Sequence, residues 1–272
     1  MSLRINQNVA AINSYRNLAN TQVSLGKSLE KLSSGFRINR AADDAAGLVK
    51  SEKLRSEVRG SQVAIRNAQD GISFVQTAEG ALNEVHAILQ RMRELAVDAA
   101  NSATTDGSAQ QKEIDELRTQ LAAIGTQTKF AGKTVFADYS TTALTFQVGA
   151  NAGDVQTFNK NLTVSASALT VGSLSVTTAS GASSAIAAID TAISTVSDNR
   201  ATLGATQNRF ESVVRNLSVA VENLTASESR IRDTDMALEM TAFTRSQILS
   251  QAGTAMLAQA NAVPQNVLTL LR

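Results

Sequence analysis

Residues 184–231 read SAIAAIDTAISTVSDNRATLGATQNRFESVVRNLSVAVENLTASESRI, and this stretch decides the fold. Along one stripe, steps of three and four residues reach apolar side chains at eleven of fourteen positions. The stripe consists of Ile186, Ile189, Ile193, Val196, Arg200, Leu203, Gln207, Phe210, Val214, Leu217, Val221, Leu224, Glu228 and Ile231. This spacing predicts one helix with a narrow apolar seam, about 70 Å long, with Ser183 or Ser184 as its N-cap. A helix of that length requires an equally long partner.

The first half of the chain contains such a partner. A second run of apolar positions predicts a helix that starts near Asp43 or Asp44 and ends around Asn101. Its stripe includes Ile65, Ala68, Ile72, Val75, Ala78, Leu82, Val85, Leu89, Met92, Ala96 and Ala99. A shorter helix follows: Ser108 and Gln111 have the spacing of a capping box, and Gly125 is expected to close the helix.

The pattern changes between residues 128 and 183, where glycine, serine and threonine are frequent. Leu144, Phe146 and Val148 alternate as in a half-buried strand, and the GANAGD stretch that begins at Gly149 predicts a hairpin turn. The sequence therefore predicts a mainly α fold, a long antiparallel helical bundle or coiled coil with a small β-hairpin-rich insertion.

Both chain ends also carry helical apolar patterns, which continue almost to the last residue. Because the ends of ordinary domains turn polar and fray, we expect these patterns to be covered by neighbouring copies of the chain. The predicted assembly residues are Ile5, Val9, Ile12, Leu18, Leu25, Leu29 and Leu32 at one end, and Leu249, Met256, Val263, Val267 and Leu270 at the other. Pro264 is expected to kink or loosen the last two turns.

Composition argues against catalysis and against several kinds of ligand. The formal net charge is +1, which provides no basic field for nucleic acid. With His86 as its one histidine and no cysteine, the chain cannot build a zinc site or a cysteine–histidine pair. No apolar stretch is long enough to span a bilayer. We therefore expect no enzyme activity, no cofactor or metal, no nucleic-acid partner and no membrane insertion. Composition alone, without a secretory signal peptide, favours a cytoplasmic protein.

Five stretches closely resemble bacterial flagellins and occur in the order found in that family. They are MSLRINQNVAAINSYRNL (1–18), KLSSGFRINRAADDAAGL (31–48), NAQDGISFVQTAEGALNEV (67–85), LQRMRELAVDAANS (89–102) and NAVPQNVLTLLR (261–272). The resemblance covers nearly all of residues 1–136 and 184–272. It implies a short flagellin that lacks the large outer domains of longer members.

The resemblance also implies a domain organisation and a biological role. Residues 1–43 and 235–272 would be the two halves of an inner coiled-coil domain, and residues 44–234 an outer-core domain. The role would be that of a structural subunit of the flagellar filament, an open helical tube that transmits motor rotation for swimming. The location would then be extracellular, reached without a cleaved signal peptide. The implied partners are other flagellin copies, the flagellar export apparatus, a flagellin chaperone, the filament cap and the hook-associated junction proteins.

Three other functions are alternatives to this one. A hook–filament junction protein shares the end motifs and is the main alternative. A cytoplasmic coiled-coil adaptor fits the periodicity but not the five motifs, and an enzyme such as an autolysin lacks catalytic residues.

One segment points to a partner outside the bacterium. LQRMRELAVDAANS resembles the flagellin stretch that a vertebrate innate immune receptor recognises, with Arg91, Leu95 and Glu113 at the matching positions. Arginine and leucine are residues that can concentrate binding energy at an interface. The same residues could instead serve only packing within the filament.

Overall fold

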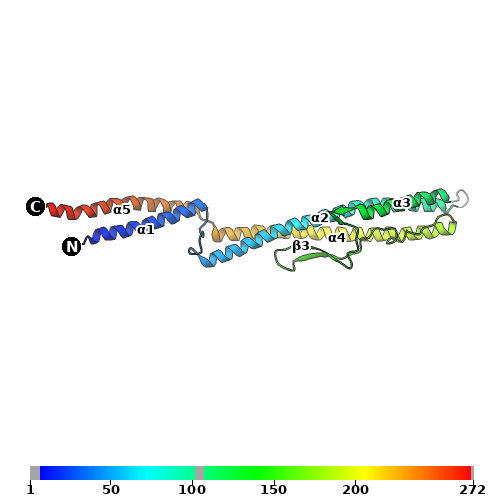
Figure 1. The fold of residues 1–272 in the computed structure, drawn as a ribbon, viewed down its shortest axis with the longest axis horizontal. Coiled ribbons are helices and arrows are strands. Elements are labelled where there is room, and N and C mark those ends of the chain that lie inside the picture. Colours follow the sequence, from blue (N-terminus) through cyan, green and yellow to red (C-terminus); the bar gives the residue numbers. More distant parts are fainter. Residues whose placement is uncertain (1–6, 102–106, 271–272) are drawn as a thin grey trace. The chain divides into compact units, whose positions relative to one another are not determined.

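The computed structural model describes residues 7–101 and 107–270, with side chains of the last helix described as far as Val263 (Figure 1). The helices are α1 (Val9–Ser34), α2 (Ala45–Ala99), α3 (Ser108–Gln127), α4 (Ala179–Arg232) and α5 (Met236–Leu270). The strands are β1 (Lys129–Phe130), β2 (Lys133–Thr134), β3 (Leu144–Gln147) and β4 (Val155–Phe158). The predicted fold class, mainly α with a small hairpin-rich insertion, is confirmed. In the part of the chain that the structure describes, no helix combines the length and apolar character needed to cross a membrane.

The chain forms two compact units. The central unit comprises residues 57–222, and the terminal unit comprises residues 1–56 together with 223–272. Both α2 and α4 contribute residues to each unit. The boundaries expected from the resemblance, at 43/44 and 234/235, stay a prediction.

The core of the central unit follows part of the stripes read from the sequence, since α4 buries Ala192, Asn199 and Thr206 where Ile193, Arg200 and Gln207 were expected. Along α4, Ile189, Val196, Leu203 and Phe210 are fully buried. They belong to one apolar cluster with the stripe of α2 (Ala68, Val75, Ala78, Leu82, Val85, Leu89, Met92, Ala96 and Ala99) and with Ile114 and Leu121 of α3. Because these side chains are mostly aliphatic, long paired helices supply the burial that few aromatic residues could supply.

Two short antiparallel hairpins, β1–β2 and β3–β4, make up the β part of the central unit. The hairpin turn predicted at Gly149 is confirmed, because Leu144 pairs with Phe158 and Gln147 with Val155 on either side of it. Phe146 of β3 packs edge-on against Phe210 of α4, with ring centroids 5.2 Å apart. The hairpin is thereby attached to the helical core.

The ends of the helices confirm one predicted helix start and correct three other predictions. The α2 start is confirmed: Asp44 Oδ1 accepts a hydrogen bond from the Gly47 N–H at 2.8 Å. The predicted cap of α4 at Ser183 or Ser184 is wrong. That helix begins at Ala179, and Thr178 Oγ1 accepts a hydrogen bond from the Gly181 N–H.

The capping box predicted for α3 is also wrong. Its N-cap is Gly107, in the left-handed region at φ 71°, without a side-chain cap bond. The Gln111 amide serves a tertiary contact instead: it donates to the Leu174 carbonyl at 3.1 Å and accepts from the Val176 N–H at 2.8 Å. Gly125 does not close the helix, which continues to Gln127.

In the terminal unit, the two connectors into and out of the helix pair lie against each other. Gly35, at φ 76°, ends α1, and Phe36 forms an antiparallel bridge with Asp233. The Arg232 guanidinium lies over the Phe36 ring at 4.8 Å and pairs with Glu52 at 2.8 Å. α5 continues past Pro264 to Leu270, so the proline does not end the helix.

Candidate assembly interface

Within the terminal unit, α1 and α5 form an antiparallel pair (Figure 1). At one end the Asn8 side chain donates to the Ala260 carbonyl at 2.7 Å, while its Oδ1 caps α1 by accepting from the Ala11 N–H. At the other end Lys31 pairs with Glu239 at 3.6 Å. The two helices are therefore held in register at both ends.

The seam between α1 and α5 contains many small side chains. Buried or half-buried residues recur in steps of three and four at Ala11, Ser14, Leu18, Thr21, Leu25, Ser28 and Leu32 of α1, and at Glu239, Phe243, Ser246, Ser250, Gly253, Leu257 and Ala260 of α5. Small side chains let helices approach closely but bury little apolar area. A Cβ placed on Gly253 would lie 3.2 Å from Leu18 Cδ1, which shows how close the approach is.

Most other large apolar side chains of the same two helices lie outside this seam and are exposed. Exposed ones are Val9, Ile12, Tyr15, Val23 and Leu29 on α1, and Met236, Leu238, Met240, Ile248, Leu249, Met256 and Val263 on α5. We call these twelve residues the outer apolar surface. Many large apolar side chains exposed on one helix pair indicate an interaction site.

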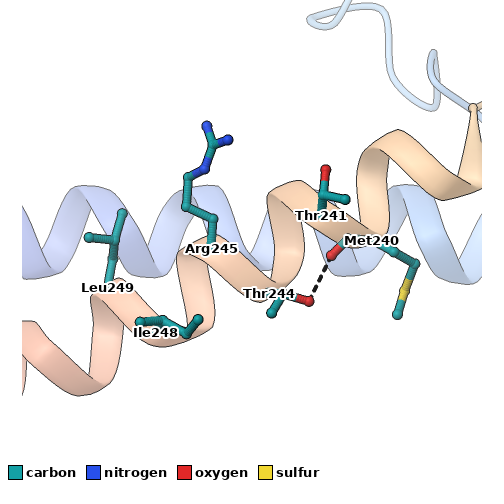
Figure 2. A pocket seen from close by; sticks show the side chains of 6 residues that line it. All are labelled: Met240, Thr241, Thr244, Arg245, Ile248 and Leu249. Atoms are coloured by element: carbon teal, nitrogen blue, oxygen red, sulfur yellow. Dashed lines mark hydrogen bonds between the residues drawn. The ribbon is translucent and has the colours of Figure 1, made fainter.

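Two shallow grooves lie on this surface. The first, of ≈ 490 Å³, is formed along α5 by Met240, Thr241, Thr244, Arg245, Ile248 and Leu249 (Figure 2). The second, of ≈ 300 Å³, lies between the two helices and is lined by Ser14, Asn17, Leu18, Thr21, Leu249, Ala252, Gly253 and Met256. Leu249 contributes to both grooves, which places it at the centre of the surface.

The predicted assembly residues divide into three groups. Val9, Ile12, Leu29, Leu249, Met256 and Val263 are exposed and free to meet another chain. Leu18, Leu25 and Leu32 instead face α5 within the same chain, so they serve the internal seam. Ile5 and the side chains of Val267 and Leu270 lie outside the described residues.

Six residues of the outer apolar surface were not predicted from the sequence: Tyr15, Val23, Met236, Leu238, Met240 and Ile248. The signal that could have found them is side-chain size. Gly253 and Ala260 share the spacing of three and four residues with the predicted residues Leu249, Met256 and Val263. Their small size, however, suits contact with a close neighbouring helix. The larger apolar residues must therefore lie on a second face.

In the central unit, Arg91 and Glu113 come together as the resemblance implied, whereas Leu95 does not join them at the surface. Arg91 Nε donates to Glu113 Oε1 at 2.8 Å, and another guanidinium nitrogen lies 3.3 Å from Glu94. These bonds, first to Glu113 and then to Glu94, raise the pKa of the Arg91 guanidinium. Leu95 is 7% exposed and belongs to the core, so it is not available as an exposed anchor.

The one histidine is part of a helix surface. His86 is half-buried on α2, and its Nε2 lies 3.0 Å from the Gln90 side-chain nitrogen. Among the described residues, no group of three or more histidine, aspartate or glutamate side chains is placed to hold a metal ion.

Comparisons with known proteins agree with this architecture. Residues 5–141 match the family model described as the bacterial flagellin N-terminal helical region, and residues 186–271 match the bacterial flagellin C-terminal helical region. The chain is 49% identical to a flagellin of Bacillus subtilis, over 99% of this chain and 100% of the relative. It is 49% identical to a flagellin of Halalkalibacterium halodurans (98% and 99%) and 45% identical to the flagellar filament 33 kDa core protein of Treponema phagedenis (98% and 99%).

Proposed function

Because the chain belongs to the bacterial flagellin family, we propose that its outer apolar surface is where copies of the chain pack together. The chain is a structural subunit of the flagellar filament, which lies outside the cell. The cytoplasmic location that composition alone favours is therefore wrong. Composition does not show whether a protein is carried out of the cell by a dedicated export route. A hook–filament junction protein is not favoured, since the relatives are flagellins and filament core proteins along their whole length.

The observation that carries the proposal is the contrast between the two faces of α5. The face toward α1 uses Ser246, Ser250 and Gly253, whereas the outward face presents Leu249, Met256 and Val263. Complete burial of a large apolar side chain contributes about 1.5–3 kcal/mol. Several such side chains offset the entropic cost of association, which is why the surface suits a permanent neighbour.

The same contacts, repeated between rotated copies without closing into a ring, give an open helical polymer. We propose that this polymer is a tube which transmits rotation of the motor for swimming. Residues 1–43 and 235–272 would form its inner coiled-coil domain and residues 44–234 its outer-core domain. Support comes from the outer apolar surface, all twelve residues of which belong to the first two ranges.

Export and assembly partners are proposed from the family alone. The chain would leave the cell through the flagellar export apparatus without a cleaved signal peptide, accompanied before export by a flagellin chaperone. It would join the filament beneath the cap and beyond the hook-associated junction proteins. The small-residue seam of α1 and α5 supports this route, because a weakly packed pair is easily unfolded for export. Intact-mass measurement of secreted protein tests it: a mass reduced by a removed leader contradicts the proposal.

Val263→Gln tests the assembly surface. Val263 is 45% exposed in the free subunit, and Val155 of β4 is equally exposed, at 45%, which makes Val155→Gln a matched control. Glutamine is a good helix former, so the change in α5 removes apolar contact rather than the helix. We expect Val263→Gln to raise the critical concentration for polymerisation about tenfold and Val155→Gln to leave it unchanged. Sedimentation of seeded polymer measures both.

Two results would contradict this proposal. If Val263→Gln polymerises like the unsubstituted chain, or if Val155→Gln is impaired as strongly, the outer apolar surface is not the assembly interface.

A second proposal concerns recognition of the subunit by a vertebrate innate immune receptor. We propose that Arg91 and Glu113 contact the receptor and that buried Leu95 acts by holding α2 in place. The proposal is supported by the exposure of the Arg91–Glu113 pair in the free chain. We further propose that packing of copies also covers this pair, so that receptor contact requires the monomer.

Arg93→Ala provides a matched control for Arg91→Ala. Arg93 lies two residues along α2, is similarly exposed, and pairs with Asp190 at 2.6 Å as Arg91 pairs with Glu113. In a cell reporter assay we expect monomer but not intact filament to signal. Replacing Arg91, but not Arg93, is expected to reduce the signal at least about tenfold. A silent monomer, or full signalling by Arg91→Ala, would rule out this contact.

A further inference from the structure

We propose that Met236, Met240 and Met256 form an oxidation-sensitive site on α5, at which conversion to methionine sulfoxide blocks assembly of the subunit. The inference rests on the proposed role of the outer apolar surface. It adds a chemical modification that controls this surface.

The four methionines in the part of the chain that the structure describes differ sharply in accessibility. Met236, Met240 and Met256 are 48%, 50% and 62% exposed, whereas Met92 of α2 is fully buried at 0%. Oxidation of methionine requires contact between the thioether sulfur and the oxidant. The three α5 residues are therefore open to attack in the free subunit, and Met92 is protected by the core.

The position of two of these residues connects oxidation to assembly. Met240 lines the groove along α5, and Figure 2 shows its side chain extending away from the helix. Met256 lines the groove between α1 and α5. Both grooves share Leu249, so the two thioethers border the centre of the outer apolar surface.

The reaction is balanced with hydrogen peroxide as the oxidant. A lone pair of the thioether sulfur attacks one peroxide oxygen, the O–O bond breaks, and the second oxygen leaves as water after proton transfer. The sulfur is oxidised to the sulfoxide and the peroxide is reduced. A flexible apolar side chain thus becomes a polar one, which disfavours burial against a neighbouring copy.

Oxidation at these positions leaves the internal contacts of the subunit intact. The α5 residues that face α1 include Phe243, Gly253 and Leu257. None of the three methionines belongs to this seam. The oxidised subunit is therefore expected to keep its helix content while losing polymerisation. In a polymer the same sulfurs are covered, so filaments are expected to resist the oxidant.

The experiment exposes free subunits to hydrogen peroxide until peptide mass spectrometry finds one added oxygen on each α5 methionine and none on Met92. We expect the critical concentration for seeded polymerisation to rise at least about tenfold, and methionine sulfoxide reductase to restore it. The triple variant Met236→Leu/Met240→Leu/Met256→Leu keeps the apolar volume and is expected to polymerise normally before and after peroxide. Met92→Leu serves as the matched control and is expected to remain peroxide-sensitive.

Two results overturn the inference: unimpaired polymerisation of subunits that carry all three sulfoxides, or an equal loss in the triple leucine variant after peroxide. Failure of the proposed interface would look different. In that case Val263→Gln, which contains no sulfur change, would also polymerise normally.

Discussion

Gly71 on α2 lies against the buried ring of Phe210 on α4, where a Cβ would come within 2.7 Å of Phe210 Cζ. Gly204, by contrast, lies within α4 with nothing inside 4 Å of the position of its missing Cβ. Both glycines lie inside long helices of the central unit, where alanine is intrinsically better by about 1 kcal/mol. Substitution by alanine at Gly204 therefore tests helix propensity alone, whereas substitution at Gly71 also tests packing against Phe210.

Replacing each glycine with alanine should change stability in opposite directions. Gly204→Ala is expected to raise the free energy of unfolding by up to about 1 kcal/mol, because it gains propensity at no steric cost. Gly71→Ala is expected to lower it by about 1–3 kcal/mol, because the Phe210 ring is fully buried and cannot move aside. Chemical denaturation monitored by circular dichroism measures both. Stabilisation by Gly71→Ala would show that the α2–α4 contact is looser than described.

For single residues, the sequence predicts some hydrogen-bonding roles correctly and others incorrectly. Asp44 caps α2 at the helix start that the sequence predicts, through a bond to the Gly47 N–H three residues away. Gln111 matches the capping-box spacing equally well, yet it bonds to backbone groups at Leu174 and Val176. A tertiary contact more than sixty residues away along the chain cannot be read from a four-residue pattern.

At the scale of the element, α5 combines two apolar faces with different partners. Steps of three and four residues group Gly253 and Ala260 with Leu249, Met256 and Val263 in one predicted stripe. In the structure the small residues face α1 and the large ones face outward. The spacing of apolar residues predicts the helix correctly. It does not distinguish two faces of the helix that lie less than about 90° apart around its axis.

The connector between α1 and α2 is an element whose details periodicity cannot predict. The Asp43 carboxylate accepts hydrogen bonds from the backbone N–H groups of Arg40 and Asn39, and these bonds lower its pKa below the usual aspartate value. Arg40 pairs with Glu30 at 2.8 Å, and the Arg37 guanidinium donates to the Ile231 carbonyl. The Asp43 bonds lie within the connector, whereas the Arg40 and Arg37 contacts reach α1 and α4, and none of them follows from helical spacing.

At the scale of the whole molecule, the two compact units are stabilised in different ways. The central unit has a large cluster of fully buried aliphatic residues, with hairpins and aromatic rings packed on it. The terminal unit has a seam that contains many small residues, while twelve large apolar side chains of α1 and α5 remain exposed. The first unit is built to fold on its own, and the second is built to gain most of its burial from other copies.

Hydrogen exchange of the free subunit and of the filament tests this difference most directly. In the free subunit we expect the amides of α1 and of α5 up to Val263 to exchange rapidly, while those of α2 and α4 inside the central unit are protected. On polymerisation, protection of α1 and α5 is expected to rise at least about a hundredfold, the effect of roughly 3 kcal/mol of added burial. The buried α2 stripe from Val75 to Met92 serves as the internal reference and should change little. Equal protection of α1 and α5 in subunit and filament would contradict the account, because the ends would then gain nothing from their neighbours.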